Sequence, residues 1–447
     1  MTSIANMFKR NFFSGCFSLQ RNTARAAALL AMLLILAPTI AACQEDPNAP
    51  APAAAPDTKH HKDKDKDKDK DKDKDKDATT SGAEQPAAAG TQTGAADGDT
   101  SKKDKKKDKD ADKDKSGVPG KAAHDHEASP TEVSWLITMH GVDGQPQQIT
   151  AVNGLGEIKG PGTGAVPNGP AGIAPHDLRG MAILPDQSVL AVNAFMKDSR
   201  ILHFGPPDAN NVRAYMNDFA KQGPANPAML HSYAIAMSPD GDVYVSNQDT
   251  NTVTRYGGFG RATPGAPLAH PESLAGFGNL PAGVFIANSQ VSPVGLSAVR
   301  GMCFGPDGYL YVADRDGSRV SSYDRKTGER VKIVVSEANG LKKPIQVTFT
   351  EDGKSLFVGD DETEQVLRLD MDSGLCSVFI PRGTAGLKAP SALVVSAKWL
   401  YVGSRLTKEI LRFEIATGKP DSKPYVTLPD HPEFLLHVIP PVEPDKK

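Results

Sequence analysis

The sequence of 447 residues predicts an all-β domain built as a six-bladed β-propeller with four strands in each blade. Three observations predict this fold. One strand–turn–strand pattern recurs five times between residues 181 and 404, and the later copies start about 45 residues apart. Further strand-like runs flank the set at both ends. A β unit of this size cannot bury its own faces, so the copies must stack on one another.

The clearest copy of the pattern begins with the apolar strand Gly301–Phe304. The turn Pro306–Gly308 follows, then a second strand, Leu310–Asp314, and a third strand from Arg319. The Asp-Gly pair supplies the positive φ that tight hairpins require. The second strands of the other four copies are Val189–Asn193, Val243–Asn247, Leu356–Asp360 and Leu400–Ser404.

The spacing between the second and third strands is shared among the copies. In four of them the third strand resumes eight residues after the last valine of the second, and in the first copy it resumes after nine. The resuming residues are Ile201, Val253, Val320, Val366 and Ile410. An up-and-down barrel or a sandwich is the alternative, but neither needs the same turn at the same place in every unit.

The two ends of the domain are predicted to share the sixth blade. Trp135–Met139 and Gln148–Val152 precede the first copy, and Phe434–Val438 follows the fifth. If the C-terminal run is the inner strand and the N-terminal runs are outer strands, the ring closes on itself. The Gly- and Pro-rich stretch Asn153–Pro175 is expected to be a long loop leading into the first full blade.

The beginning of the chain has the features of a secretory signal peptide, which we place at residues 1–42. Basic residues precede the apolar run Ala26–Leu36, and small residues lead to Cys43. The run is too short for a convincing transmembrane helix. Ile40–Cys43 resembles the bacterial lipobox, which implies that Cys43 is the lipidated first residue of the mature protein. An ordinary signal with an accidental cysteine is the alternative.

The resemblance to lipoproteins also implies a location. Gln44 follows the cysteine, and by similarity to the enterobacterial sorting rule a residue other than Asp directs a lipoprotein to the outer membrane. We therefore expect lipid anchoring in the cell envelope, facing the periplasm or the cell surface, rather than in the inner membrane. Several acyl chains hold a protein stably, whereas a single chain binds only marginally.

Residues 43–131 are predicted to form a disordered tether. Lys and Asp alternate from Lys62 to Asp77, and a second cluster of both runs from Lys102 to Lys115. A segment without apolar side chains cannot offset the entropy cost of ordering. Such a tether has a root-mean-square span of roughly 50 Å. Residues 132–440 are then the propeller, and residues 441–447 are a tail.

Composition narrows the classes of partner. The formal net charge of −3 gives no sign of nucleic-acid binding. Cys303 and Cys376 are the cysteines that remain in the propeller, and we expect both to be small buried apolar residues rather than a disulfide. We expect a monomer attached to the membrane by the lipid on Cys43.

A propeller gathers the loops that lead into its inner strands at one mouth of the central channel. The ends of the second strands meet there, and four of these ends carry amide or carboxylate side chains. This candidate ligand-binding ring consists of Asn193, Asn247, Asp314 and Asp360, with His176, Asp177, His231 and Arg300 nearby. Converging oxygens suit Ca²⁺. Alternatively, Asn and Asp are there as turn formers, and we assign no cofactor.

The repeated motif resembles the NHL-repeat class of six-bladed propellers and the related gluconolactonase and streptogramin-lyase groups. The resemblance rests on the Pro-Asp-Gly turn, on Leu310–Asp314 and on Tyr323–Gly328, and it covers roughly Val133–Val438. It implies the fold, which hosts enzymes, binding platforms and scaffolds alike. In lactonase-like relatives a metal at the channel mouth polarises the substrate. The matching set of three histidines of the zinc lyases is absent, so no zinc site is transferred.

Two functions of different classes are compatible with these features. The first is a lipid-anchored binding or scaffold module for an envelope protein, peptide, glycan or small ligand. The alternative is a divalent-metal-dependent lactonase, hydrolase or lyase acting at the channel mouth. Because the sequence contains no complete catalytic constellation, we favour the non-enzymatic function.

Overall fold

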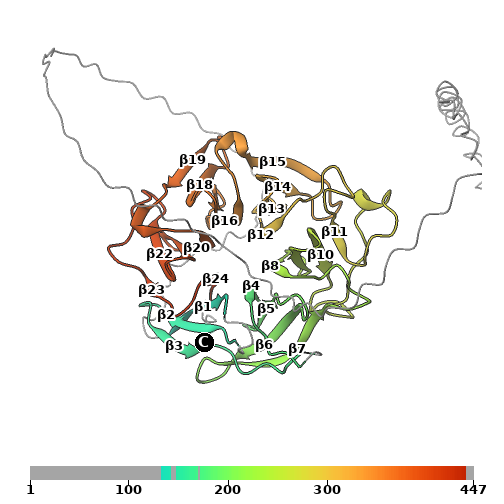
Figure 1. The fold of residues 1–447 in the computed structure, drawn as a ribbon, viewed down its shortest axis with the longest axis horizontal. Coiled ribbons are helices and arrows are strands. Elements are labelled where there is room, and N and C mark those ends of the chain that lie inside the picture. The colour runs from blue at the N-terminus through green and yellow to red at the C-terminus, as the bar shows by residue number, and fades with distance from the viewer. Residues whose placement is uncertain (1–131, 142–146, 170–171, 439–447) are drawn as a thin grey trace, which may run out of the picture. The chain divides into compact units, whose positions relative to one another are not determined.

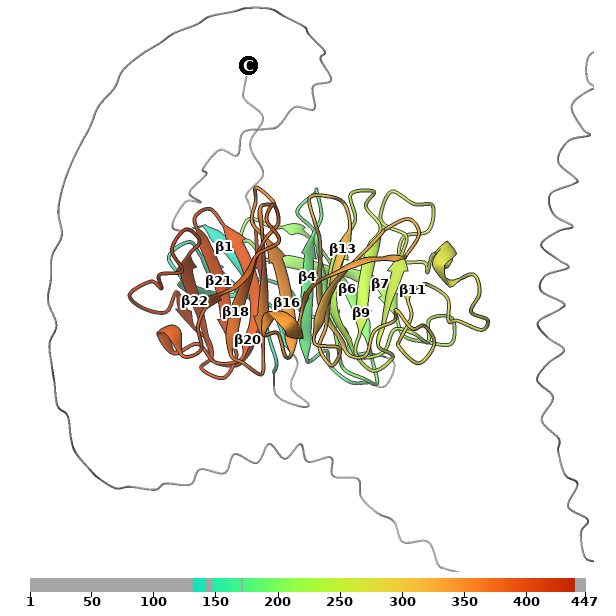
Figure 2. The same cartoon turned by 90° about the horizontal axis from the view of Figure 1, so that it is seen from above.

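The structure is a computed structural model that describes residues 132–141, 147–169 and 172–438. The predicted signal peptide, tether and tail lie outside the described residues. Six four-stranded antiparallel sheets are arranged radially about one axis, which confirms the six-bladed propeller (Figure 1). Seen from the side, the sheets form a flat disc with loops on both faces (Figure 2).

Five blades are each made from one continuous segment, with the innermost strand first in sequence. One blade comprises β4 (Leu178–Ile183), β5 (Val189–Asn193), β6 (Arg200–Pro207) and β7 (Arg213–Lys221). The next comprises β8 (Ser232–Met237), β9 (Val243–Asn247), β10 (Thr252–Tyr256) and β11 (Val284–Ile286). The third comprises β12 (Val299–Phe304), β13 (Leu310–Asp314), β14 (Arg319–Tyr323) and β15 (Arg330–Ser336). The fourth comprises β16 (Pro344–Phe349), β17 (Ser355–Asp360), β18 (Gln365–Asp370) and β19 (Cys376–Ile380). The fifth comprises β20 (Pro390–Ser396), β21 (Trp399–Ser404), β22 (Glu409–Glu414) and β23 (Val426–Thr427).

The sixth blade joins the two ends of the domain, as the sequence predicts. Its strands, from the axis outward, are β24 (Pro432–His437), β1 (Val133–Met139), β2 (Thr150–Asn153) and β3 (Ile158–Pro161). In the antiparallel pairing of β1 with β24, Leu136 lies opposite Leu436 and Ile137 lies opposite Leu435. Pairing with the N-terminal strand β1 therefore holds the C-terminal strand β24 in the propeller and closes the circle of blades.

The expectation that Asn153–Pro175 is one continuous loop is wrong, because β3 lies within it. This strand pairs with β2 through its backbone, while its side chains are largely exposed. A strand at the outer edge of a blade needs hydrogen bonds but not an apolar face, so it leaves no alternating pattern in the sequence.

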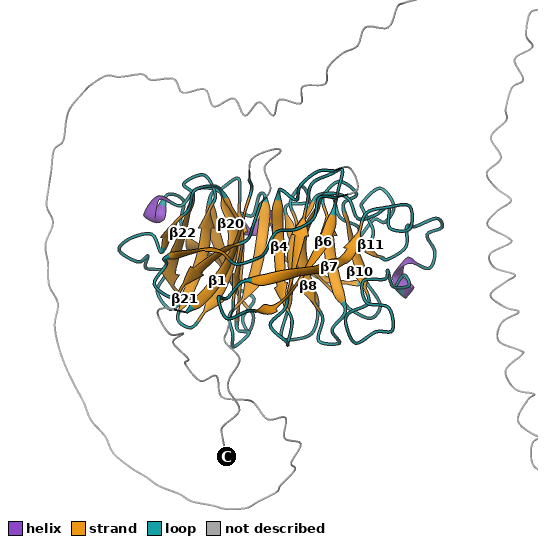
Figure 3. Ribbon diagram, turned by 90° about the horizontal axis from the view of Figure 1, so that it is seen from below, coloured by secondary structure: helices purple, strands orange, loops and turns teal. Residues whose placement is uncertain are grey.

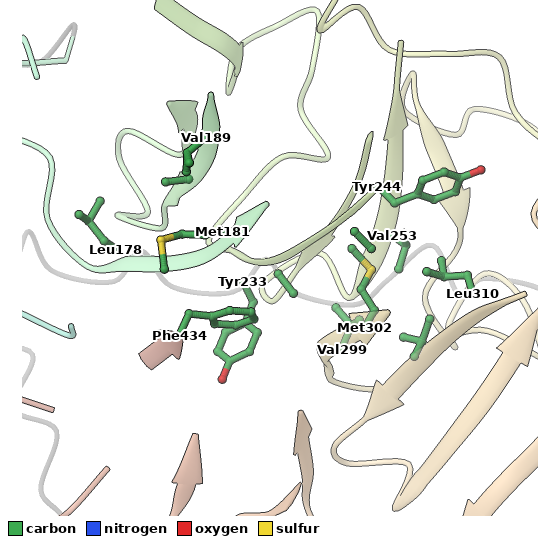
Figure 4. Packing of buried hydrophobic residues seen from close by; sticks show 14 of the residues in the cluster. Leu178, Met181, Val189, Tyr233, Tyr244, Val253, Val299, Met302, Leu310 and Phe434 are labelled. Carbon is green, nitrogen blue, oxygen red and sulfur yellow. The ribbon is translucent and has the colours of Figure 1, made fainter. Parts of the chain in front are cut away.

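The core lies between neighbouring blades, and it repeats an aromatic contact. The second strands of several blades carry an aromatic ring that packs against the adjoining blade: Tyr244 lies 5.2 Å from Phe304 and Tyr311 lies 4.9 Å from Phe349, as ring centroids. At the closing blade, Trp135 lies 4.3 Å from Tyr401. Figure 4 shows part of the largest apolar cluster, which spans several inner strands. Burial of these aromatic side chains between neighbouring blades stabilises the circular arrangement of the six sheets.

Neighbouring inner strands approach one another closely at two glycines that occupy equivalent positions. A Cβ atom on Gly180 of β4 would lie 2.8 Å from the Cα atom of Ala234 on β8. A Cβ atom on Gly301 of β12 would overlap the side chain of Gln346 on β16. Both positions therefore require the smallest residue for the inner strands to close round the axis.

Helical structure in the described residues is limited to three short 3₁₀ turns, η1 (Glu272–Leu274), η2 (Glu337–Asn339) and η3 (Thr384–Gly386) (Figure 3). Across the described ranges, none of the helices combines the length and hydropathy that crossing a membrane would require. Cys303 on β12 and Cys376 on β19 are free thiols, but both are only partly buried, so the expectation that they are buried is wrong.

Candidate functional site

One face of the propeller gathers the starts of the inner strands and the ends of the second strands. In each continuous blade the first residue of the inner strand pairs with the last residue of the second strand, as Leu178 does with Asn193 and Val299 with Asp314. We call this side of the disc the axial face. In the closing blade the same place is taken by the start of β24 and the end of β1.

The predicted ring of strand-end side chains lies at this face, but each member points into its own blade. Asn193, Asn247, Asp314 and Asp360 are fully buried. The backbone N–H of His176 donates to Oδ1 of Asn193 at 3.1 Å. Asp360 accepts backbone N–H bonds from Lys342 and Lys343. Each side chain thus ties the loop before the inner strand to the end of the second strand.

The other two members of the ring have the same role. The backbone N–H groups of Ser297 and Ala298 both donate to Oδ1 of Asp314 at 2.9 Å, and Ser232 Oγ donates to Asn247 at 2.9 Å. The four side chains are therefore hydrogen-bonded within four separate blades. Within the described ranges, no three His, Cys, Asp or Glu side chains lie together as metal ligands would. Calcium binding by this ring stays an untested prediction.

A network of buried charges lies nearer the axis, centred on Arg179 of β4. Its guanidinium group lies 2.6 Å from a carboxylate oxygen of Asp177 and 2.5 Å from one of Glu433 on β24. Arg405 also binds Glu433, at 2.9 Å. His140 follows β1, and its Nδ1 lies 3.4 Å from both carboxylates. Cations and carboxylates therefore alternate across three neighbouring blades.

The network extends toward the next blade through His231. Its Nε2 lies 3.7 Å from Asp177, and its Nδ1 lies 3.0 Å from Asp249. Asp177 and His231 both have left-handed backbone, with φ of 60° and 51°. Their carbonyl oxygens accept the N–H of Ala194 and Gln248, the residues just after the second strands. This turn puts both side chains at the axial face in a backbone conformation that few residues other than glycine adopt, although Asp and His are among those that tolerate it best.

The charges in the network stabilise one another's ionised forms. Burial alone would raise the pKa of Glu433, but Arg179, His140 and Arg405 together lower it to about 2. Burial likewise opposes ionisation of Asp177, yet bonds to His140 and His231 and the charge of Arg179 hold its pKa well below the usual range. Bonds to Asp177 and Glu433 raise the pKa of His140 to about 9, against a smaller opposing effect of burial. At neutral pH Glu433, Asp177 and His140 are therefore charged.

One position recurs round the axis, the second residue of every inner strand. We call this set the inner collar. It consists of Arg179, Tyr233, Arg300, Ile345, Ser391 and Glu433. Neighbouring inner strands contact one another round the ring, so the polar members of the collar lie near one another. The guanidinium groups of Arg179 and Arg300 lie 5.9 and 5.8 Å from the centre of the Tyr233 ring.

A second group of charges borders Arg300. Arg315 lies 3.2 Å from Asp361 and 3.7 Å from Asp316, and Lys343 lies 2.9 Å from Asp316. These side chains are between about a third and a half exposed, so they form the solvent-facing rim of the axial face. Their ion pairs keep both cations beside the axis.

Sequence reasoning found part of this site. Of the predicted residues, the structure brings Asp177 and His231 together and puts Arg300 in the inner collar. His176 instead is buried and stacks on Phe195, with ring centroids 4.0 Å apart. The residues that sequence reasoning missed are His140, Arg179, Tyr233, Arg405 and Glu433. A signal was present, because Arg179, Arg300 and Glu433 are charged residues at the same position of otherwise apolar inner strands.

The axial face and the blade count define the class of protein: a six-bladed β-propeller with a charged, preorganised axial face. Neither a protein-family profile nor a curated protein matches the sequence. Among solved structures, it is similar to a chain of a nidogen/laminin complex, with 15% identity and a TM-score of 0.49 over 68% of this chain and 97% of that chain.

Two further structures are similar at the same level. A provisionally assigned 6-phosphogluconolactonase of Bacteroides fragilis has 16% identity and a TM-score of 0.46 over 69% of this chain and 98% of that one. Virginiamycin B lyase of Staphylococcus aureus has 14% identity and a TM-score of 0.36 over 55% and 68%. Likeness at this level says nothing about ligand or chemistry.

Proposed function

We propose that this protein is a lipid-anchored propeller of the bacterial cell envelope that binds an envelope protein, peptide, glycan or small ligand at its axial face. The observation that carries the proposal is the charge network around Arg179. Buried charges cost free energy and are held here in fixed positions by one another. Fixed polar groups at the axis of a propeller are suited to recognition, because little ordering is left for a ligand to bring about.

The anchor part of the proposal rests on Ile40–Cys43, which resembles a lipobox. Its test is metabolic labelling of the full chain with an alkyne fatty acid. We expect label and membrane fractionation in the wild type and in a Cys303→Ser variant, and loss of both in Cys43→Ser. Label that persists in Cys43→Ser would contradict lipid attachment at this residue.

The binding part can be tested with a matched pair of double variants. His231→Ala/Asp249→Ala removes an exposed hydrogen-bonded pair of side chains from the axial face. Asp240→Ala/Arg325→Ala removes an ion pair formed by the hairpin turns of the opposite face. We expect the second double variant to cross-link as much envelope material as the wild type does. The first double variant should cross-link less. Equal cross-linking in all three proteins would rule out the axial face as the binding site.

The metal-dependent alternative has less support, because Asp177 and Glu433 are already neutralised by arginine and histidine. A divalent ion at these oxygens would have to displace bound cations. Metal analysis of the full protein before and after dialysis against chelator tests this point. Stoichiometric Ca²⁺ or Zn²⁺ whose removal lowers thermal stability would favour the enzyme instead.

A further inference from the structure

Arg300 differs from the other axial arginines in its lack of a counter-charge. Arg179, Arg315 and Arg405 each lie within 3.2 Å of a carboxylate oxygen. Arg300 forms no ion pair with any described residue, and its Nη1 donates only to the neighbouring carbonyl of Val299 at 2.8 Å. Its side chain is half-buried, and burial lowers its pKa. A guanidinium group partly removed from water without a partner is unfavourable unless another molecule supplies the missing anion.

Tyr233 supplies a second hydrogen-bond donor beside this cation. The Arg300 guanidinium lies over its ring, and the ring is also 6.0 Å from Phe434 of β24, so Tyr233 extends from β8 across the axial region. Its hydroxyl points away from the labelled apolar side chains in Figure 4. Burial raises the pKa of Tyr233 further above its usual value, so the hydroxyl remains protonated and able to donate throughout the physiological range.

The Tyr233 side chain is buried, with 4% of its surface exposed, and none of the hydrogen bonds among the described residues uses its hydroxyl. The Arg300 guanidinium lies beside it and has one hydrogen bond, to the carbonyl oxygen of Val299, but no carboxylate partner among the described residues. A charged donor and a neutral donor thus lie side by side.

The charge balance of the surrounding face favours an anion. In the network of Arg179, Arg405 and protonated His140, three cations meet the two carboxylates of Asp177 and Glu433. Asp249, which contacts the network through His231, balances the third of these cations. On the other side, Arg315 and Lys343 pair with the two carboxylates of Asp316 and Asp361, and the unpaired Arg300 lies beside them. This second group carries one surplus positive charge, although the whole chain is net negative. The region around Arg300 therefore attracts anions, most strongly at low ionic strength.

We propose that the axial face recognises an oxyanion, a carboxylate or phosphate group of its ligand, between the Arg300 guanidinium and the Tyr233 hydroxyl. This proposal rests on the proposed binding function and names the chemical group it takes. The planar fork of Arg300 matches the two oxygens of such a group. The hydroxyl of Tyr233 fixes its orientation. Arg315 and Lys343 at the rim, already paired, add long-range attraction rather than direct contacts.

The test uses full-length protein in detergent and four probes: inorganic phosphate, acetate, N-acetylglycine and, as a neutral control, N-acetylglycinamide. Thermal unfolding is followed at constant ionic strength as each probe is titrated. We expect saturable stabilisation by an oxyanion and none by the amide. A response to phosphate alone or to the carboxylates alone identifies which group the site prefers.

Variants assign the response to the site. Arg300→Gln should weaken oxyanion binding about tenfold or more, because a charge-assisted bidentate contact is lost. Arg300→Lys keeps the charge but not the planar guanidinium, so its oxyanion affinity should lie between those of the wild type and Arg300→Gln. Tyr233→Phe should weaken oxyanion binding several-fold. Arg382→Gln, at an exposed ion pair on an outer loop, is the matched control and should bind as the wild type does.

Stability without probe separates a recognition role from a structural one. Because Arg300 is unpaired, Arg300→Gln should unfold at the same temperature as the wild type or higher. The proposal is overturned if no oxyanion stabilises the wild type, or if Arg300→Gln responds equally. It is also overturned if Arg300→Gln is strongly destabilised, which would mean that Arg300 is paired within the protein. If envelope material still cross-links at the axial face when any of these results is obtained, the proposed binding function is retained and only the oxyanion proposal is refuted.

Discussion

Replacing Glu433 by glutamine removes one charge from the centre of the axial network while keeping the size of the side chain. The Glu433 side chain is 3% exposed and contacts Arg179, Arg405 and His140. It lies on β24, the C-terminal strand that closes the ring. Glu433→Gln should therefore lower the free energy of unfolding by weakening both the network and the closing blade.

Two lines of reasoning give a similar magnitude for this loss. Removing one partner of a buried ion pair typically costs about 3–5 kcal/mol. Independently, the pKa of Glu433 falls from 4.5 to about 2, which corresponds to roughly 3 kcal/mol of stabilisation of the charged form. Arg179 keeps Asp177 as a partner after the substitution. We therefore expect a loss near the lower end of the range, about 3 kcal/mol.

The assay is denaturant unfolding of the full chain at neutral pH and at stepwise lower pH. Glu337→Gln, which removes an exposed partner of Lys342, is the matched control and should leave the free energy of unfolding nearly unchanged, because water screens this pair. Because the folded-state pKa of Glu433 is lowered, its contribution is present above pH 4.5 and is lost as pH falls toward 2. The wild type should therefore approach the variant in acid. A loss no larger than that of the control would refute the reasoning.

Two further substitutions probe the same network and the packing beneath it. The pKa of His140 is raised, so its stabilising effect is fully present below pH 6.5 and is lost as pH rises through about 9. Thermal unfolding across this window should show a decline in the wild type that His140→Gln lacks, and an equal decline in both would contradict the pairing. Gly180→Ala puts a Cβ atom 2.8 Å from the backbone of β8 and should destabilise the fold by about 1–3 kcal/mol. Gly260→Ala, with open space around it, should be within about 0.5 kcal/mol of the wild type, and similar midpoints for the two variants would argue against close packing of the inner strands.

The fold could be predicted from the sequence because every full blade repeats the same pattern of apolar strands and turns. Each second strand is a run of buried apolar residues, as in Leu310–Asp314, and it follows a turn such as Pro306–Gly308 whose glycine takes positive φ. The repetition reveals the blades without any knowledge of their contacts. β3 escaped prediction because its residues, Ile158–Pro161, are mostly exposed and pair only through the backbone.

The candidate site was harder to predict, because side-chain direction depends on neighbours distant in sequence. Asp360 was correctly placed at the end of a strand, but backbone N–H groups of the preceding loop draw its carboxylate into the blade. Arg179 and Glu433 are far apart in the chain and meet only once the C-terminal strand has closed the ring. The contact between these two side chains depends on closure of the propeller, which a local sequence pattern cannot predict.

The inner collar separates two uses of arginine at the same structural position. Arg179 of β4 is held between Asp177 and Glu433, so its charge contributes to closure of the ring. Arg300 occupies the same position of β12, three inner strands round the axis from β24, and no described carboxylate reaches it. Loss of the Glu433 charge should therefore destabilise the protein, whereas loss of the Arg300 charge should not, since only the first has a partner to leave behind. A loss of stability at Glu433 and none at Arg300 would distinguish a charge that closes the fold from one that is left for a ligand.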